Sequence, residues 1–380
     1  MPDISGDFLV PPSAVVPGGI LVYDWAKCRL LVDKTVIPDV MSMSCMRSAD
    51  ISAGIATIKL LDVNKEIYDS IQTGQEVEIY LSEQSPMTYG NKVWGGYLES
   101  REFDVNNKIV LILKAKEYSN ILIRSFTADT AQANKNSFTG IAAGTAIKAL
   151  MSNYQLDFTS DNVTVVSADL ITADYLNQNL FDSIKSICDQ FGYVFYINLD
   201  KDLVVRPSTT VVETPATDYL TYTENMNSIS QEDNKEFLCN DLIVYGASTG
   251  VVSNSGSALQ DANSIAAYGQ YSKRLYISSL TTSADCTTYA NAYLAIYKNP
   301  IQEYKTVSRL IANSEPLQYI PVTASQANLS DSYQIREMSH YYDKKGIRTE
   351  MTLDRKVVNL SMTLGQLLSE VRALQAKNYV

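Results

Sequence analysis

Histidine is almost absent from this chain of 380 residues, which contains only His340. A mechanism that needs two histidines is therefore excluded, and no histidine–cysteine pattern with the spacing of a metal site surrounds His340. The residue lies in an expected strand beside Tyr341 and Tyr342. We expect His340 to have a structural role, and we expect no metal and no cofactor.

Cysteines are few and irregularly spaced. The five of them are scattered and include no C-x-x-C pair: Cys28, Cys45, Cys188, Cys239 and Cys286. This pattern argues against a disulfide framework and favours folding in a reducing compartment. Cys188 falls on the apolar face of an expected helix, where a cysteine acts as a small hydrophobic residue.

Targeting and membrane signals are also missing. The first residues lack the basic start and apolar stretch of a signal peptide, and no apolar run is long enough to span a bilayer. Residues 1–19 contain Pro11, Pro12 and Pro17 followed by a Gly-Gly pair, which predicts an extended N-terminal arm.

Catalytic signatures are lacking as well. The chain has no G-x-S-x-G, no phosphate-binding G-x-x-x-x-G-K-[ST] and no G-x-G-x-x-G after a strand. Carboxylate pairs exist, such as Glu99 with Glu102 and Asp200 with Asp202, but they fall in strands and turns. A chain with 42 acidic residues always contains such pairs, so a glycosidase is the weakest hypothesis.

Acidic residues outnumber basic ones by 42 to 31, which gives a net charge of −11. A surface that grips nucleic acid needs an excess of lysine and arginine, so this balance argues against one. It is compatible with a channel through which DNA passes without adhering. The 25 tyrosines suit half-wet β surfaces and subunit interfaces, or simply a β-rich composition.

One stretch, residues 177–207, predicts a helix followed by a β-hairpin. Apolar residues recur at helical spacing, Asn179 can cap the start, and Gly192 can end the helix in a left-handed conformation. The aromatic and β-branched run from Tyr193 to Ile197 suits a strand, and Asp200–Asp202 suits the turn before the returning strand. Together with a helix expected over 144–151, it predicts a small α+β unit.

The regions on both sides of this unit predict mainly β structure. Before it we expect short antiparallel strands, which are typical of a sandwich or barrel, at 28–33, 35–37, 55–60, 76–81, 92–99 and 108–115. Turns are expected at 33–34 and 106–107, and a helical turn near 117–122. Residues 127–137 predict a linker. After it we expect strands at 240–246, 306–311 and 332–338, and a last hairpin formed by 339–342 and 348–353 around a turn at 343–346. We also expect a long loop at 247–264 and a helix at 286–298.

A last helix is expected over 360–378. It carries an apolar seam at heptad spacing, formed by Leu364, Leu367, Val371 and Leu374. This helix is a candidate for oligomerisation or for docking another chain, and packing on its own domain remains an equal alternative.

The order of these pieces resembles the baseplate hub, or tail tip, proteins of tailed phages and related contractile injection systems. The resemblance covers about residues 20–358. It rests on four parts and their order in the chain. The first is a β region that contains Trp94-Gly95-Gly96 and Tyr118–Leu122, and the second is the helix–hairpin, with 181–197 and 202–205. The third is the strand at 240–246, and the fourth is the Tyr-rich helix that ends at Asn299-Pro300.

The resemblance implies a mainly β, α+β fold with two tail-tube-like antiparallel barrels or sandwiches. The implied division is an arm at 1–19, β domains at 20–126 and 208–358, an α+β insertion at 127–207, and a C-terminal helix at 359–380. Three copies would close into a ring that presents six similar positions and joins a six-fold tail tube to a three-fold spike or fibre.

The resemblance also implies partners and a location. The partners are a tail tube or distal tail protein above, a spike, fibre or tip protein below, and a tape measure protein, with DNA passing through the lumen and no membrane anchor. The chain would be a non-enzymatic virion protein that assembles in the host cytoplasm. The alternative is a carbohydrate-binding adhesin or tail fibre domain whose tyrosines stack on sugars.

Overall fold

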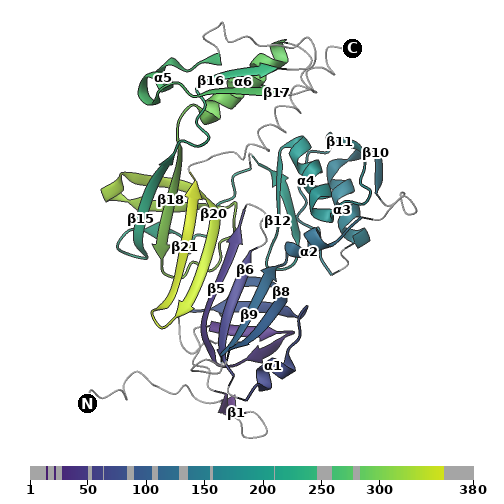
Figure 1. Ribbon diagram of the computed structural model, residues 1–380, viewed down its shortest axis with the longest axis vertical. Coiled ribbons are helices and arrows are strands. Elements are labelled where there is room, and N and C mark those ends of the chain that lie inside the picture. Colours follow the sequence, from purple (N-terminus) through teal and green to yellow (C-terminus); the bar gives the residue numbers. More distant parts are fainter. Residues whose placement is uncertain are drawn as a thin grey trace.

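A 13-stranded and mainly antiparallel sheet connects the early part of the chain with the late part (Figure 1). The computed structural model describes residues 14–15, 21–22, 28–49, 54–62, 64–83, 90–104, 110–127, 136–154, 157–208, 210–245, 259–276 and 283–354. In these residues strands are much more abundant than helices, so the prediction of a mainly β chain is confirmed.

The first part of the sheet is built from strands that alternate between a buried and an open face. They are β3 (Cys28–Val32), β4 (Thr35–Ile37), β5 (Val40–Ser48), β6 (Ile55–Leu61), β7 (Glu76–Leu81), β8 (Asn91–Asp104) and β9 (Val110–Glu117), with helix α1 (Glu66–Ser70) between β6 and β7. Asp33 and Lys34 adopt positive φ in the predicted turn. The apolar side chains of one face form a single core around the fully buried Trp94.

Close contacts with neighbouring atoms explain why glycine occupies two positions of the Trp94-Gly95-Gly96 segment in β8. A side chain at Gly95 would overlap the ring of Tyr118, and one at Gly96 would overlap the backbone carbonyl of Lys116 in β9. The segment therefore lets Tyr118 and strand β9 approach β8 more closely than any larger residue would permit.

The second part of the sheet has its own core. Its strands are β14 (Leu220–Thr221), β15 (Met226–Asn234), β18 (Ile301–Ser308), β19 (Tyr319–Ala324), β20 (Leu329–Asp343) and β21 (Gly346–Asp354), with the short 3-10 helix η3 (Ser325–Ala327). Most neighbours are antiparallel, but β14 and β19 are parallel. The strand expected at 306–311 runs instead from Ile301 to Ser308, because the chain becomes extended directly after Pro300 and pairs with β15 from Ile301 onward.

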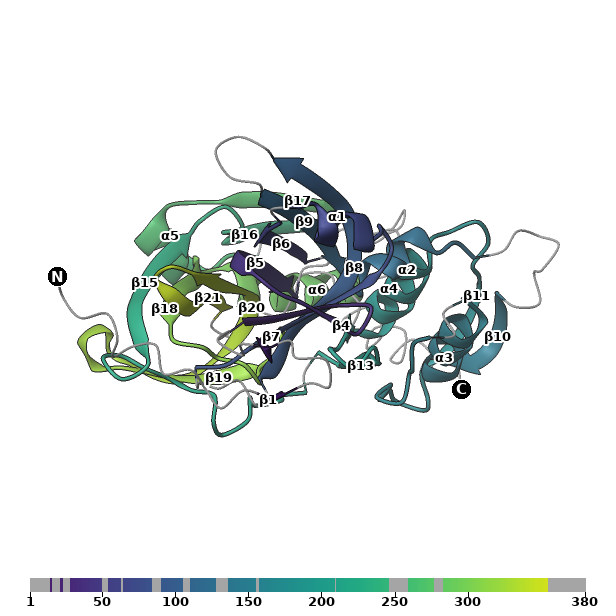
Figure 2. The same ribbon diagram turned by 90° about the horizontal axis from the view of Figure 1, so that it is seen from below.

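The helix–hairpin lies beside the sheet, together with the other insertion elements (Figure 2). Its parts are α4 (Leu180–Phe191), β12 (Tyr193–Ile197) and β13 (Leu203–Pro207). The Asn179 side chain accepts a hydrogen bond from the Asp182 amide, and Gly192 ends the helix at φ 71°. Both caps and the predicted turn, in which Lys201 has φ 62°, are confirmed.

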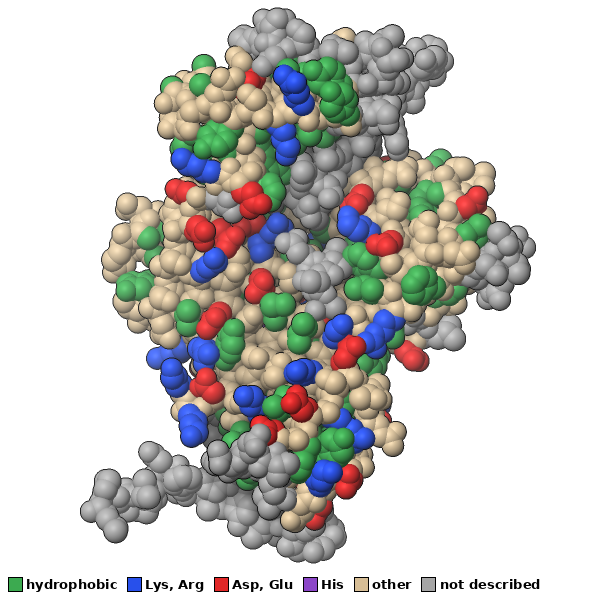
Figure 3. Space-filling model, in the orientation of Figure 1, with side chains coloured by type: hydrophobic (Ala, Val, Ile, Leu, Met, Phe, Trp, Pro, Cys, Tyr) green, Lys and Arg blue, Asp and Glu red, His purple; other side chains and the backbone are tan. Residues whose placement is uncertain are grey.

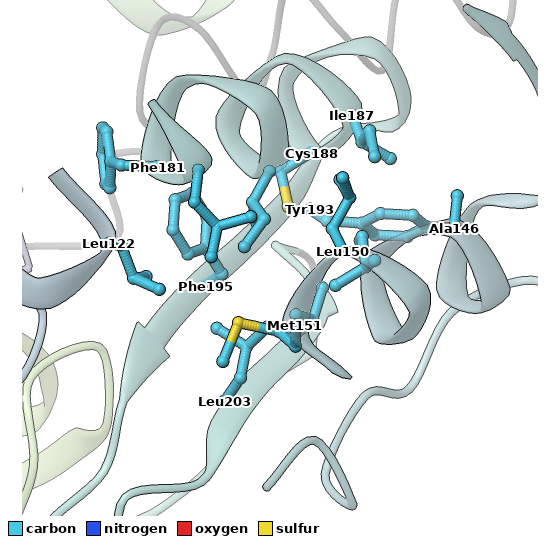
Figure 4. Close-up of a cluster of buried hydrophobic side chains, with 14 of the residues drawn as sticks. Leu122, Ala146, Leu150, Met151, Phe181, Ile187, Cys188, Tyr193, Phe195 and Leu203 are labelled. Atoms are coloured by element: carbon cyan, nitrogen blue, oxygen red, sulfur yellow. The ribbon is translucent and has the colours of Figure 1, made fainter. Parts of the chain in front are cut away.

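One apolar core holds this insertion together (Figure 4). Helices α3 (Ala143–Tyr154) and α4 pack on each other, and α4 packs on β12. Leu150, Ile187 and Cys188 are buried between these elements, which confirms that Cys188 serves as a small hydrophobic residue. Helix α2 (Asn120–Arg124) joins the core through Leu122 and links it to the end of β9.

A fourth core lies at the far end of the molecule, at the top of Figure 1. It contains β16 (Asp241–Tyr245), β17 (Ser272–Tyr276), α5 (Ala262–Tyr268) and α6 (Ser283–Tyr297). Strands β16 and β17 pair in parallel. Tyr289, Tyr293 and Tyr297 lie on the buried face of α6, as the helical spacing predicts.

Several elements were not expected from the sequence, including helix α1 and strands β5, β15, β17 and β19. β10 (Ser137–Ala142) begins at the end of the expected linker and pairs with β11 (Leu170–Asp174), and neither strand was predicted. Helix α5 begins inside the predicted loop 247–264, because the Asp261 carboxylate accepts from the Ser264 amide and caps a helix there. The 106–107 turn and most of the N-terminal arm lie outside the described residues, apart from the short pair β1 (Ala14–Val15) and β2 (Leu21–Val22).

Replacing Gly96 by alanine should destabilise the protein by roughly 1–3 kcal/mol, because the new methyl group must displace the β9 backbone. Urea unfolding followed by circular dichroism measures the change. Ser100→Ala in the same strand pair is the control and should cost under about 0.5 kcal/mol. Equal stability of Gly96→Ala and the parent chain would contradict the close approach of β8 and β9.

Candidate functional site: the sheet seam and its open edges

His340, the first residue that the sequence singles out, is buried in β20. Its Nδ1 lies 3.1 Å from the Thr349 hydroxyl on β21. Burial, followed by the nearby positive charge of Arg47, lowers the pKa of His340 to about 3. The imidazole is therefore neutral near pH 7 and serves as a hydrogen-bonding group between two strands.

The carboxylate pairs also have structural partners. Glu99 pairs with Arg124 at 2.6 Å and with Lys116 at 3.5 Å. Asp202 accepts hydrogen bonds from the Thr159 hydroxyl, the Asp161 amide and Asn162. Although burial opposes it, these donors lower the pKa of Asp202, so its charge stabilises the loop at 159–162 that follows α3. Among the described residues no group of three or more His, Cys, Asp or Glu could hold a metal ion.

The seam between the two parts of the sheet is the pairing of β5 with β20. Along one edge, strand β20 pairs with β19 through residues 329–334 and with β5 through residues 337–342. Along its opposite edge, β20 pairs with β21. The register shifts between Ile335 and Glu337, at the point where β20 changes partner. One strand thus belongs to both parts, and the seam makes a single sheet of them.

A buried ion cluster sits at the end of this seam. The Arg47 guanidinium on β5 donates to Glu117 of β9 at 2.9 Å, and its charge lies 3.6 Å from the Glu315 carboxylate. It also reaches the carbonyl oxygen of Ile197 in the helix–hairpin at 3.5 Å. The Arg47 side chain is only 2% exposed. Burial alone would lower the pKa of Arg47, but the two carboxylates raise it, so the guanidinium stays charged.

Other polar contacts tie the hairpin to the same two sheet regions. Lys201 in its turn pairs with Glu76 of β7 at 2.7 Å. Arg206 of β13 donates to the carbonyl oxygen of Leu317 at 3.0 Å, just before β19. The helix–hairpin therefore braces both parts of the sheet rather than one.

A side branch of the sheet through β19 ends in the two-residue strand β14, and the main path of the sheet ends in two open edges within the part of the chain that the structure describes. One is β15, paired on one side with β18, and the other is the short β4, paired with β3. Along β15 residues 230–233 are exposed, and on β4 Val36 is 45% exposed. Open strand edges are surfaces on which another chain can add a strand.

The predicted docking helix cannot be placed. Leu364, Leu367, Val371 and Leu374 lie outside the described residues. No described helix is both long and apolar enough to cross a membrane. The sequence did not reveal the seam or the Arg47 cluster, since its partners come from residues 47, 117, 197 and 315.

Comparison with known proteins gives no match to a family model and no match among curated sequences. Solved structures do match. The chain resembles the 43 kDa tail protein of prophage MuSo2 from Shewanella oneidensis, with a TM-score of 0.65 and 11% identity over 88% of this chain and 98% of that one. The chain has the fold of phage tail proteins.

Two more structures support this fold. A tail protein from Neisseria meningitidis gives a TM-score of 0.62 with 12% identity, over 89% of this chain and 98% of that one. The prophage tail protein gp18 from Listeria monocytogenes gives 0.55 with 11% identity, over 92% of this chain and all of that one. The phage tail fold thus extends over most of the chain, as the resemblance in the sequence implies.

Replacing Arg47 by methionine should destabilise the protein by about 3–5 kcal/mol, because the buried Glu117 and the partly buried Glu315 lose their counter-charge. Urea unfolding measures the loss. Lys305→Met is the matched control, since it removes an exposed pair with Glu232 and should cost less than about 1 kcal/mol. A similar small loss for both variants would show that the cluster does not hold the seam.

Acid should weaken the fold in part through His340. Its folded pKa of about 3 lies below its ordinary value of 6.5, so the unfolded chain binds a proton first as the pH falls. This contribution is complete above pH 6.5 and declines by up to about 1.4 kcal/mol per pH unit toward pH 3. His340→Gln should flatten the pH dependence of the unfolding free energy between pH 6 and 4. An unchanged slope would contradict the assignment.

Proposed function

We propose that this chain is a non-enzymatic structural protein of a phage-like tail, and more closely a hub in its baseplate. The observation that carries the proposal is a phage tail fold extending over most of the chain, in which one sheet joins two β regions. Candidate catalytic residues are few among the described residues, because His340 and the carboxylates Glu99 and Asp202 are engaged in structural contacts.

The two open edges favour a ring. β4 and β15 stand at opposite ends of the strand order, so the β15 edge of one copy can meet the β4 edge of the next. Such a head-to-tail contact between different surfaces closes into a ring when the rotation fits. With three copies and two β regions in each, the ring presents six similar positions on one side and three-fold symmetry overall.

The proposed domain division assigns one tube-like β domain to each of the two β regions of the sheet. Residues 20–126 and 208–358 supply the two tube-like β domains, 127–207 supply the brace, 1–19 an arm and 359–380 a C-terminal helix. The separate core around β16, β17 and α6 would then be an excursion from the second β domain, entered after β15 and left before β18.

This role defines the surroundings of the chain. In the virion, the ring would stand at the distal end of the tail, with the tube or a distal tail protein above and a spike, fibre or tip protein below. The tape measure protein would end near it, and DNA would cross its lumen without sequence-specific contacts. Assembly would take place in the host cytoplasm.

A ring of three predicts a particle mass of three times the 42.1 kDa of one chain. Native mass spectrometry of the purified chain measures it, and electron microscopy of the assembled particle shows whether a three-fold ring stands at the tube end. Val36→Glu at the β4 edge should shift the population toward monomers, because it places a charge in the subunit contact.

Leu61→Glu is the matched control, since Leu61 is similarly exposed at 38% but lies on β6 in the interior of the sheet. It should leave the trimer intact. A chain that is monomeric both in solution and in the particle contradicts the hub. Glycan binding by such a monomer would favour the adhesin alternative.

A further inference from the structure

Strands β16 and β17 form a two-stranded parallel sheet that is covered on one face. Leu242 and Val244 of β16 lie in the core with α6, and Leu275 of β17 packs against that core. Within the described part of the chain, α6 is the one helix that packs extensively on these strands. Parallel sheets are normally covered on both faces, so the described residues of this unit leave it without a second layer.

The uncovered face carries a preformed aromatic surface, which we call the tyrosine face: Ile243, Tyr245, Arg274 and Tyr276. Side chains alternate along a strand, so these residues point away from α6. Tyr245 and Tyr276 are in register, and their rings stack with centroids 4.6 Å apart and planes 11° apart. Tyr276 is nevertheless 77% exposed. Figure 3 shows hydrophobic and basic side chains together on this uppermost part of the molecule.

The end of the last described strand lies close to this unit. Asp354, the last residue of β21, is in register with Glu303 of β18. β18 begins at Ile301, shortly after α6 ends at Tyr297. The remaining residues, 355–380, therefore start beside the unit that lacks a layer.

The sequence of those residues fits the tyrosine face in size and chemistry. Leu364 and Leu374, the ends of the apolar seam, are ten residues apart, or about 15 Å along a helix. The five-residue strand β17 is of similar length, about 16 Å. Glu370 is the one acidic residue after Asp354 and borders the seam, and Arg274 is the basic residue of the face.

We propose that residues 360–378 form a helix that packs its apolar seam on the tyrosine face of the same chain. Leu364, Leu367, Val371 and Leu374 cover the stacked rings, and Glu370 pairs with Arg274. The helix supplies the missing second layer and makes a helix–sheet–helix unit with α6. This inference does not depend on the tail function, because it concerns the packing of one chain on itself.

Hydrogen exchange on the full-length protein tests the contact from both sides. Leu367→Asp with Val371→Asp should accelerate amide exchange in residues 241–245 and 272–276 at least tenfold. The control is Ser369→Asp with Ala373→Asp, which adds the same charge on the opposite side of the expected helix and should leave these strands protected. Tyr276→Ser should in turn accelerate exchange over residues 360–378, whereas Tyr268→Ser, also exposed but in α5, should not.

Disulfide trapping decides whether one chain or two are involved. A chain with Tyr276→Cys and Leu367→Cys should form an internal crosslink on mild oxidation, and two co-expressed chains with one change each should form none between them. Crosslinks between copies would overturn packing within one chain. Unprotected amides over 360–378 in the parent protein, or unchanged strand exchange in the Leu367→Asp, Val371→Asp variant, would overturn the proposal altogether.

Discussion

The buried charge of Arg47 is the constraint on which the arrangement of the molecule depends. A guanidinium that is 2% exposed needs counter-charges and acceptors close by, because removing it from water is costly. Its partners come from β9, from the loop before β19 and from the helix–hairpin. If one of these regions moved away, the buried guanidinium would lose one of its partners, so the cluster holds three distant parts of the chain relative to one another.

The β5–β20 seam extends this fixed arrangement from the Arg47 cluster to both parts of the sheet. Because β20 pairs with β19 along one half and with β5 along the other, the two β regions behave as one body with two open edges. The proposed ring would need such a rigid body, since every copy would have to present both edges at a fixed angle. Lys201 and Arg206 of the helix–hairpin strengthen this body through contacts with Glu76 and with the backbone at Leu317.

Polar and aromatic residues that could be catalytic or ligand-binding residues in the sequence mostly have packing and hydrogen-bonding roles in the structure. His340 bridges two strands, Asp202 organises a loop, and Tyr289, Tyr293 and Tyr297 fill the core beside α6. Tyr118 fills the space that Gly95 leaves open. The stacked pair of Tyr245 and Tyr276 is different, because one of its rings faces solvent.

The sequence by itself determined the local elements. The caps at Asn179 and Gly192, the turn at Asp33 and Lys34, and the alternation of β6 and β7 depend on neighbouring residues, so they could be predicted and are confirmed. Only the tertiary structure decided the β5–β20 seam, the parallel pair β16–β17 and the Arg47 cluster. These contacts join residues that are far apart in the chain, and no local pattern specifies which strand or carboxylate becomes the partner.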